Sequence, residues 1–102
     1  MKMYILIKDD APSGIAIVAA AHASLAAYLK FNEHENMKSW LSGSFYKVVC
    51  MVNAKEFETA KSFEDSVVLT ESSLGGAEVA IAFMPRNEWP KPFKFYRKWK
   101  AV

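Results

Sequence analysis

The fold of this chain is decided by the stretch GIAIVAAAHASLAAYLK, which runs from Gly14 to Lys30. Seven alanines between Ala16 and Ala27 give the stretch a high helix propensity, and apolar residues occupy nearly every face until Lys30. A helix that is apolar all round is usually buried on more than one side, so we expect this one to lie inside the molecule. Ser13 is placed to cap its first turn.

Apolar runs with the character of strands precede and follow this helix. They are Met3 to Ile7, Phe45 to Val52, Val67 to Thr70 and Glu78 to Met84. Shorter helices are expected over Met37 to Leu41, which packs Met37, Trp40 and Leu41 inward, and over Ala54 to about Phe63, with Asn53 as its cap. Helices that alternate with apolar strands predict an α/β domain, with a mixed four-stranded sheet flanked by helices.

Length and composition fit one domain that spans residues 1–102. The single cysteine, Cys50, excludes an intrachain disulfide, fits a reducing compartment and sits in an apolar run, which predicts a buried thiol. No secretory signal is visible, because the first apolar run is short and leads straight into acids. The apolar run from Ile15 to Leu29 has about 15 residues, fewer than the ~20 that a bilayer needs. We therefore expect a soluble, cytoplasmic protein without a membrane partner.

A tail that begins at about Arg86 interleaves basic and aromatic side chains. Between Arg86 and Lys100 it holds six basic residues and one acid, Glu88. One interpretation is RNA binding, in which aromatic rings stack on bases and cations pair with phosphates. The cations predicted for this role are Lys91, Lys94, Arg97 and Lys98. The other interpretation, which we favour slightly, is that the aromatic residues cover the sheet or a partner subunit while the cations face water. We expect a short terminal helix from Phe93 to Trp99.

Three features of residues 3–85 point to a known family. The first strand is followed by a turn that contains aspartate and by a helix that reads AAAHASLAAY from Ala19 to Tyr28. Trp40 and Gly43 precede a strand that reads KVVCMV, and the last strand reads VAIAFMP and ends at Pro85. In these features the chain resembles the type II peptidyl-tRNA hydrolases. The resemblance implies the three-layer sandwich of that family, an activity that cleaves the ester between peptide and tRNA, tRNA as a partner and no cofactor.

The chain departs from that family where the resemblance would place catalysis. When the sequences are aligned on His22, the catalytic lysine of the family falls at Ile15 and its glutamine at Ala19. The loop before the last strand is shortened to ESSLGG, in which only Glu71 stands near the family's aspartate. Ester hydrolysis needs an activated water and a donor or cation for the developing oxyanion, and neither Ile15 nor Ala19 supplies one. Two functions therefore stay open: a divergent peptidyl-tRNA hydrolase, or a non-catalytic homodimeric module that binds RNA or a small ligand.

If hydrolysis is retained, the candidate catalytic residues are His22, Asp10 and Glu71, with Lys8 in place of the missing lysine. Three of these residues, His22, Asp10 and Lys8, have a simpler explanation. His22 would be hydrogen-bonded in the core or lie at a dimer contact, which we favour about two to one. Asp10 and its neighbour Asp9 would solvate a turn and favour the helix N-terminus, and Lys8 would be an ordinary exposed lysine. No spacing of ligands predicts a metal site.

Overall fold

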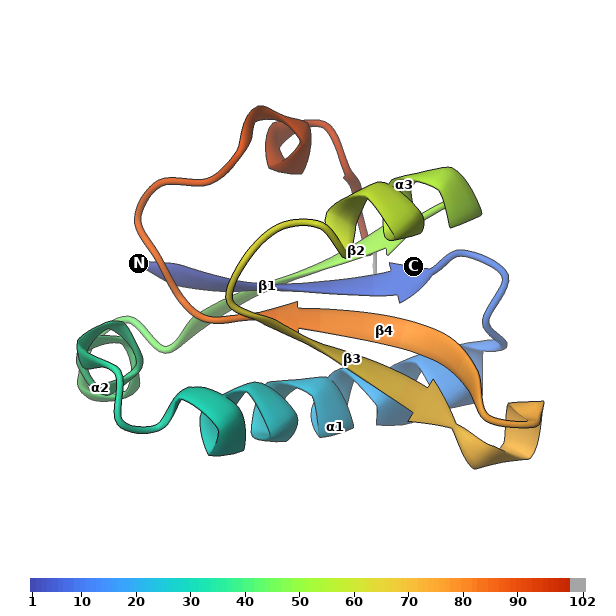
Figure 1. The fold of residues 1–102 in the computed structure, drawn as a ribbon, viewed down its shortest axis with the longest axis horizontal. Helices are drawn as coiled ribbons and strands as arrows, with labels where there is room; N and C mark the ends of the chain where they lie inside the picture. The colour runs from blue at the N-terminus through green and yellow to red at the C-terminus, as the bar shows by residue number, and fades with distance from the viewer. Residues whose placement is uncertain (100–102) are drawn as a thin grey trace.

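A five-stranded mixed sheet forms the centre of the computed structural model, which describes residues 1–99 (Figure 1). The strand order is β3-β4-β1-β2-β5. The strands are β1 (Lys2–Lys8), β2 (Tyr46–Val52), β3 (Ser66–Glu71), β4 (Ala77–Phe83) and β5 (Arg97–Lys98). β1 and β2 are parallel, whereas β1–β4, β3–β4 and β2–β5 are antiparallel. The α/β class and the mixed sheet are confirmed. The prediction of four strands is wrong by one, because the two-residue β5 lies in a tail without strand-like alternation.

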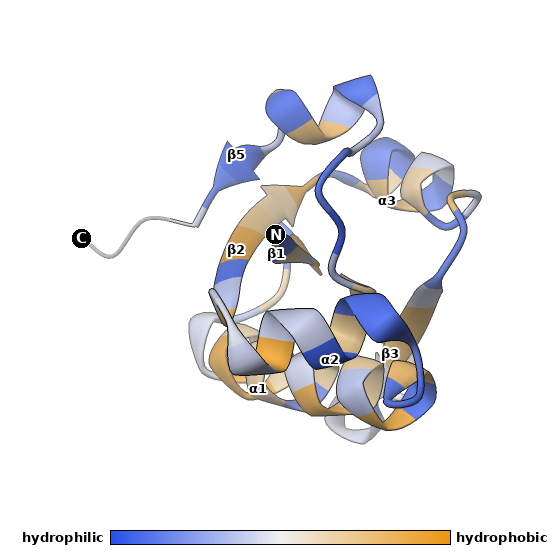
Figure 2. Ribbon diagram, turned by 90° about the vertical axis from the view of Figure 1, so that its left-hand side faces the viewer, coloured by the Kyte–Doolittle hydropathy of each residue, from blue (hydrophilic) through white to orange (hydrophobic). Residues whose placement is uncertain are grey.

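β1 is the central strand, and both of its faces are covered. The side chains of Met3, Ile5 and Ile7 pack in one hydrophobic cluster, and those of Tyr4 and Leu6 pack in the other. This alternation follows from the two-residue period of a strand. Figure 2 shows the resulting layers, with α1 and α2 on one side of the sheet and α3 on the other.

α1 (Ser13–Phe31) packs on β4, β3 and β1 through small side chains. Its buried residues are Ala16, Ala19, Ala23 and Ala27. The predicted cap at Ser13 is wrong: Ser13 lies inside the first turn, and the carbonyl of Pro12 accepts the first helical hydrogen bond from Ala16 at 2.9 Å.

The opposite side of α1 remains exposed, so the prediction that the helix is buried on more than one side is also wrong. Ile17 is 69% exposed and Leu29 is 62% exposed. Among the described helices, α1 alone is long and apolar enough to cross a membrane by length and composition. Its alanine side nevertheless belongs to the core beneath the sheet.

The second face of the sheet is covered by α3 (Ala54–Ala60) and η2 (Lys91–Lys94). α3 begins with the predicted cap, since Asn53 Oδ1 accepts from the backbone of Glu56 at 2.8 Å and Glu56 Oε1 accepts from the backbone of Asn53 at 2.9 Å. The helix ends at Ala60, before the predicted Phe63. Cys50 is buried on this face as predicted, and burial raises the pKa of its thiol to about 11.

The tail from Arg86 to Tyr96 covers this second face. Phe93 and Tyr96 are buried and Trp89 is half-buried, which confirms the covering interpretation for these rings. Phe95 is the exception, because it is 71% exposed. The predicted helix from Phe93 to Trp99 is wrong: η2 is a 3₁₀ turn that starts at Lys91, and β5 follows it.

α2 (Glu35–Ser42) closes one end of the molecule. Met37 and Trp40 are buried as predicted, and the indole of Trp40 donates to the carbonyl of Tyr46 at 2.8 Å. Leu41, predicted to pack inward, is exposed. The helix ends at Gly43, where a Cβ would lie 2.8 Å from the carbonyl oxygen of Ser39.

Candidate functional site

The residues predicted for catalysis are divided between the two faces of the sheet. His22 lies exposed on α1, near Glu71 at the end of β3. Lys8 belongs to the opposite face, where its amine lies 4.6 Å from the ring centroid of Phe57 on α3. His22 is thus close enough to Glu71 for its charge to act on the carboxyl, whereas Lys8 lies on the other face. Of the two simpler explanations for His22, a hydrogen bond within the core is wrong, because the side chain is exposed, and a dimer contact stays a prediction.

Glu71 is held by the short turn that follows it. Its Oε2 accepts from the backbone N–H of Ser73 at 3.0 Å and from the Ser73 hydroxyl at 2.8 Å. These two bonds lower the pKa of Glu71, and the charge of His22 adds a smaller effect in the same direction. The turn, η1 (Ser72–Leu74), ends at Gly75 with a φ of 67°, which glycine adopts without steric cost. This arrangement favours the charged form of the carboxylate.

Asp9 and Asp10 occupy the turn between β1 and α1, and both are exposed. Oδ2 of Asp9 pairs with Nη2 of Arg97 at 3.0 Å, and the backbone N–H of Asp9 donates to the carbonyl of Val52 at 2.8 Å. Asp9 thus ties β5 to the end of the central strands.

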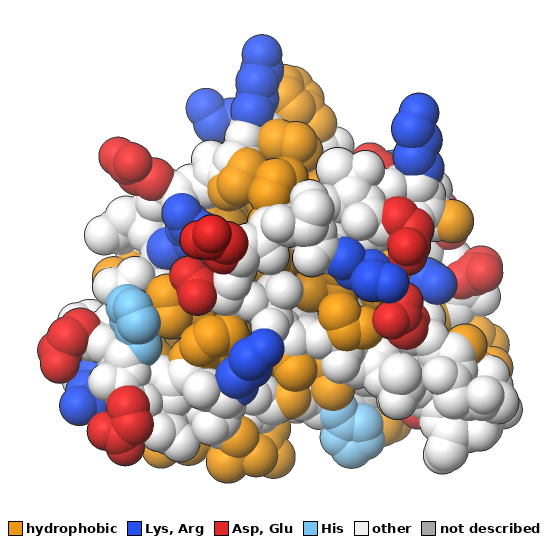
Figure 3. Space-filling model, viewed as in Figure 1, with side chains coloured by type: hydrophobic (Ala, Val, Ile, Leu, Met, Phe, Trp, Pro, Cys, Tyr) orange, Lys and Arg blue, Asp and Glu red, His pale blue; other side chains and the backbone are white. Residues whose placement is uncertain are grey.

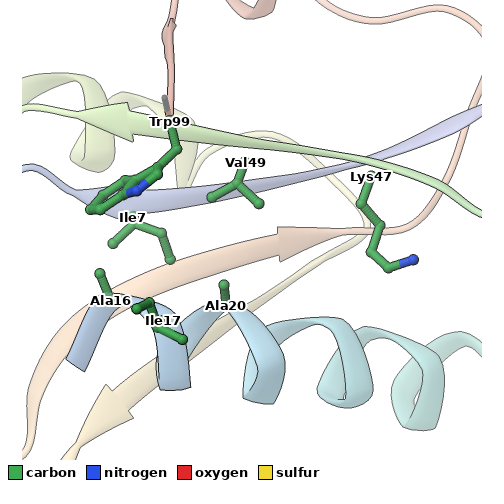
Figure 4. A pocket seen from close by; sticks show the side chains of 7 residues that line it. All are labelled: Ile7, Ala16, Ile17, Ala20, Lys47, Val49 and Trp99. Atoms are coloured by element: carbon green, nitrogen blue, oxygen red, sulfur yellow. The ribbon is translucent and has the colours of Figure 1, made fainter. Parts of the chain in front are cut away.

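A pocket opens beside α1 because this helix packs on β4, β3 and β1 and leaves β2 uncovered on the same face. Its volume is ≈ 440 Å³, within the range of small-molecule sites. It is lined by Ile7, Ala16, Ile17, Ala20, Lys47, Val49 and Trp99 (Figure 4).

The two ends of the pocket differ in chemistry. Trp99 closes one end, held by a hydrogen bond of 2.7 Å from its backbone N–H to the carbonyl of Val49. Lys47 stands at the other end, with apolar side chains between them (Figure 4). Nζ of Lys47 donates to the carbonyl of Phe45 at 3.0 Å and lies 3.3 Å from the Phe45 ring centroid. Partial burial lowers the pKa of this amine. An aromatic wall, an apolar floor and one cation suit a flat apolar ligand that carries an anionic group.

The four tail cations predicted for RNA do not share one surface. The register of β5 on β2 pairs Met51 with Arg97 and Cys50 with Lys98, and residues directly opposite each other share a face. Arg97 therefore lies on the same face as Trp99 and the pocket, whereas Lys98 lies on the α3 face. Lys91 and Lys94 belong to η2, which also covers the α3 face.

Sequence reasoning missed this pocket. Lys47 counted only as part of a strand motif and Trp99 only as one of several tail aromatics. The available signal was the alternation of β2, which places Lys47 and Val49 on one face and Val48 and Cys50 on the other. What the sequence does not contain is the position of α1 across the sheet.

No family model and no curated protein matches this sequence. The resemblance to type II peptidyl-tRNA hydrolases therefore stays a prediction. Within residues 1–99, no group of three His, Cys, Asp or Glu side chains is arranged to hold a metal ion.

Proposed function

We propose that this protein is an RNA-binding module. It would be a divergent relative of the peptidyl-tRNA hydrolases that binds RNA without cleaving the ester between peptide and tRNA. The observation that carries the proposal is the position of Trp99. Its side chain lines an apolar pocket directly after a basic strand, with Lys47 at the far end. Unpaired bases bind proteins chiefly by stacking on aromatic rings, while their phosphates pair with nearby cations.

In this binding mode one unpaired base enters the pocket against the indole of Trp99. The phosphates of its nucleotide and a neighbour reach the amine of Lys47 and the guanidinium of Arg97. Arg97 is 60% exposed and its carboxylate partner Asp9 is 37% exposed, so water screens their pairing and leaves the guanidinium accessible. The resemblance favours tRNA, whose unpaired 3′ end offers such bases.

Two positions count against hydrolysis. Ala19 is buried in the hydrophobic cluster beneath the sheet, and Ile15 packs against the same cluster. They contribute apolar contacts where the resemblance places the glutamine and the lysine of the family. Binding thus needs only groups that this chain has, whereas hydrolysis needs a replacement for both.

The experiment is the affinity of the purified protein for a short fluorescent single-stranded RNA, measured by anisotropy for the wild type and two variants. Trp99→Ala is expected to weaken binding by about 5- to 150-fold, the effect of one lost stacking contact of ~1–3 kcal/mol. Phe95→Ala is the matched control, since Phe95 is an exposed aromatic of the same basic tail outside the pocket. It should bind as the wild type does. Equal affinities for wild type and Trp99→Ala would contradict the proposal.

The salt dependence gives a second check. With two phosphate contacts, the logarithm of the binding constant should fall with the logarithm of the salt concentration with a slope of about −1.4. Lys47→Ala should reduce that slope by about half, whereas Lys38→Ala, an exposed lysine on α2, should leave it unchanged. A much steeper slope in the wild type would indicate a broad electrostatic surface in place of this pocket.

A second candidate, hydrolysis of the peptidyl-tRNA ester, is favoured by the pair of His22 and Glu71. Glu71 is a charged carboxylate suited to orient a water molecule, and an exposed imidazole lies near it in the part of the fold where the resemblance places catalysis. Release of peptide from peptidyl-tRNA should then be lost in His22→Ala and Glu71→Gln. Lys8→Ala, on the opposite face of the sheet, is the control and should keep full turnover. If the wild type releases no peptide, RNA binding is the only one of the two proposed functions that remains.

A further inference from the structure

The outer side of α1 is an exposed apolar surface. Hydrophobic side chains gather along the lower edge of the molecule in Figure 3, over α1. Five large ones are exposed on this helix: Ile17, Val18, Leu25, Tyr28 and Leu29. Between Ser13 and Leu29 the helix carries no Lys, Arg, Asp or Glu. On soluble proteins, a large exposed apolar patch of this kind usually marks an interaction site.

We propose that this surface binds a second copy of the same chain, with the two α1 helices antiparallel and the two-fold axis at Ala21. Residues of α1 recur at intervals of three and four along the outer side, at Gly14, Ile17, Ala21, Leu25 and Tyr28. This spacing forms one seam along a helix, as in paired helices that cross at about 20°. The inference does not rest on the proposed RNA binding, although Ile17 belongs both to this seam and to the lining of the pocket.

The seam is complementary to itself about Ala21. In an antiparallel pair centred there, residues whose numbers add to 42 face each other, so Ile17 meets Leu25 of the other copy and Gly14 meets Tyr28. A two-fold interface requires this reciprocity. Gly14 has nothing within 4 Å of the position of a Cβ, which leaves room for the tyrosine ring. Small Ala21 on the axis lets the two helices approach to about 8 Å. A different partner would give no reason for the position of Gly14 opposite Tyr28.

The area of the seam sets the strength of the dimer. α1 has 19 residues, which gives a length of about 28 Å. A single helix face of that length buries less than the about 1,200 Å² of total surface found in stable complexes. The dimer is therefore reversible and should dissociate on dilution.

The first test is sedimentation velocity of the full chain from about 1 μM to about 1 mM, the range in which a weak dimer dissociates. The wild type should pass from monomer to dimer. Leu25→Glu should stay monomeric, because two carboxylates would be buried in the seam. Phe95→Glu is the control: it adds the same charge at another exposed hydrophobic position, outside α1, and should dimerise normally. Circular dichroism checks that both variants are folded.

The second test fixes the axis. Ala21→Cys should form a disulfide-linked dimer under mild oxidation, because only residues near the axis lie within 4.4–6.8 Å of their own copy. Glu58→Cys, exposed on α3, should not, and the native Cys50 is buried. A wild type that is monomeric throughout, or a dimer that Leu25→Glu leaves intact, would overturn the proposal. Monomers that bind phosphatidylcholine vesicles through Leu25 would overturn it in favour of a membrane surface.

Discussion

The two faces of the sheet are covered in different ways. On the α3 face, α3 and η2 lie over a closed cluster of aromatic rings, in which Phe93 lies 5.0 Å from Tyr4, 5.1 Å from Phe83 and 5.0 Å from Trp89 between ring centroids. On the α1 face one alanine-rich helix covers β4, β3 and β1 and leaves β2 open as a pocket. A closed face stabilises the fold, and an incompletely covered face leaves a site for a ligand. The proposed RNA site therefore lies on the α1 face.

The largest expected effect on stability lies on the α3 face. Phe93→Ala should lower the free energy of unfolding by about 3–5 kcal/mol, because it empties the centre of the aromatic cluster. Trp99→Ala, on the open face, should cost less than half as much. Urea unfolding of both variants at equilibrium makes the comparison. Equal losses would mean that the open face is as much a part of the core as the closed one.

The two sides of α1 should also respond differently to added volume. Ala23→Leu should destabilise by about 1–3 kcal/mol, because Ala23 is fully buried between helix and sheet. Ala21→Leu adds the same atoms on the exposed side and should change the stability by less than about 0.5 kcal/mol in dilute solution. Thermal unfolding of the pair tests this. A large loss in Ala21→Leu would show that the outer side is already filled.

The start of α3 gives a smaller effect. Asn53→Ala removes one half of the capping box and should cost about 1 kcal/mol. Lys55→Ala, at an exposed position in the first turn of the same helix, is the control. Urea unfolding measures the stability of both variants. An unchanged free energy of unfolding in Asn53→Ala would mean that tertiary contacts alone stabilise the start of the helix.

The smallest effect is the pH dependence of the Glu71 turn. The folded-state pKa of Glu71 is lowered from 4.5 by its bonds to Ser73. A carboxyl with a lowered pKa adds stability above its unfolded pKa and loses this contribution as pH falls through the folded pKa. The difference in stability between wild type and Glu71→Gln should therefore be present at neutral pH and be lost in acid, as the pH falls through the lowered folded-state pKa of Glu71. Glu33→Gln, an exposed residue outside the turn, is the control, and a difference that persists in strong acid would contradict the argument.

Elements with a strong local signal could be predicted from the sequence. The apolar run of β1 and the capping residues of α3 determine those elements locally, so both were found. The exposure of α1 was not found, because a pattern that is apolar all round does not show how many neighbours cover a helix. β5 was missed because two residues carry no period and pair with β2 only after η2 has turned the chain.

The candidate site was also only partly predictable from the sequence. The resemblance singles out Glu71 as a candidate, whereas the pocket depends on where α1 crosses the sheet and on the hydrogen bond that places Trp99 over β2. Lys8, predicted to take the place of the missing lysine, directly follows the buried strand. The two-residue period of the strand turns its side chain to the α3 face, away from His22.

The most direct test uses the three tryptophans as reporters in a nitrogen-15 NMR titration with short single-stranded RNA. The indole N–H of Trp89 donates to the carbonyl of Arg86 at 2.9 Å on the α3 face and serves as the internal control. The ring of Trp40 lies 5.1 Å from Nζ of Lys47 and therefore reports on that end of the pocket. If RNA binds in the pocket, the indole signal of Trp99 shifts with added RNA, together with the amides of Ala20 and Val49, while the indole signal of Trp89 stays in place. Shifts confined to the tail lysines and Phe95, or no shift of Trp99 at saturating RNA, would contradict this binding mode.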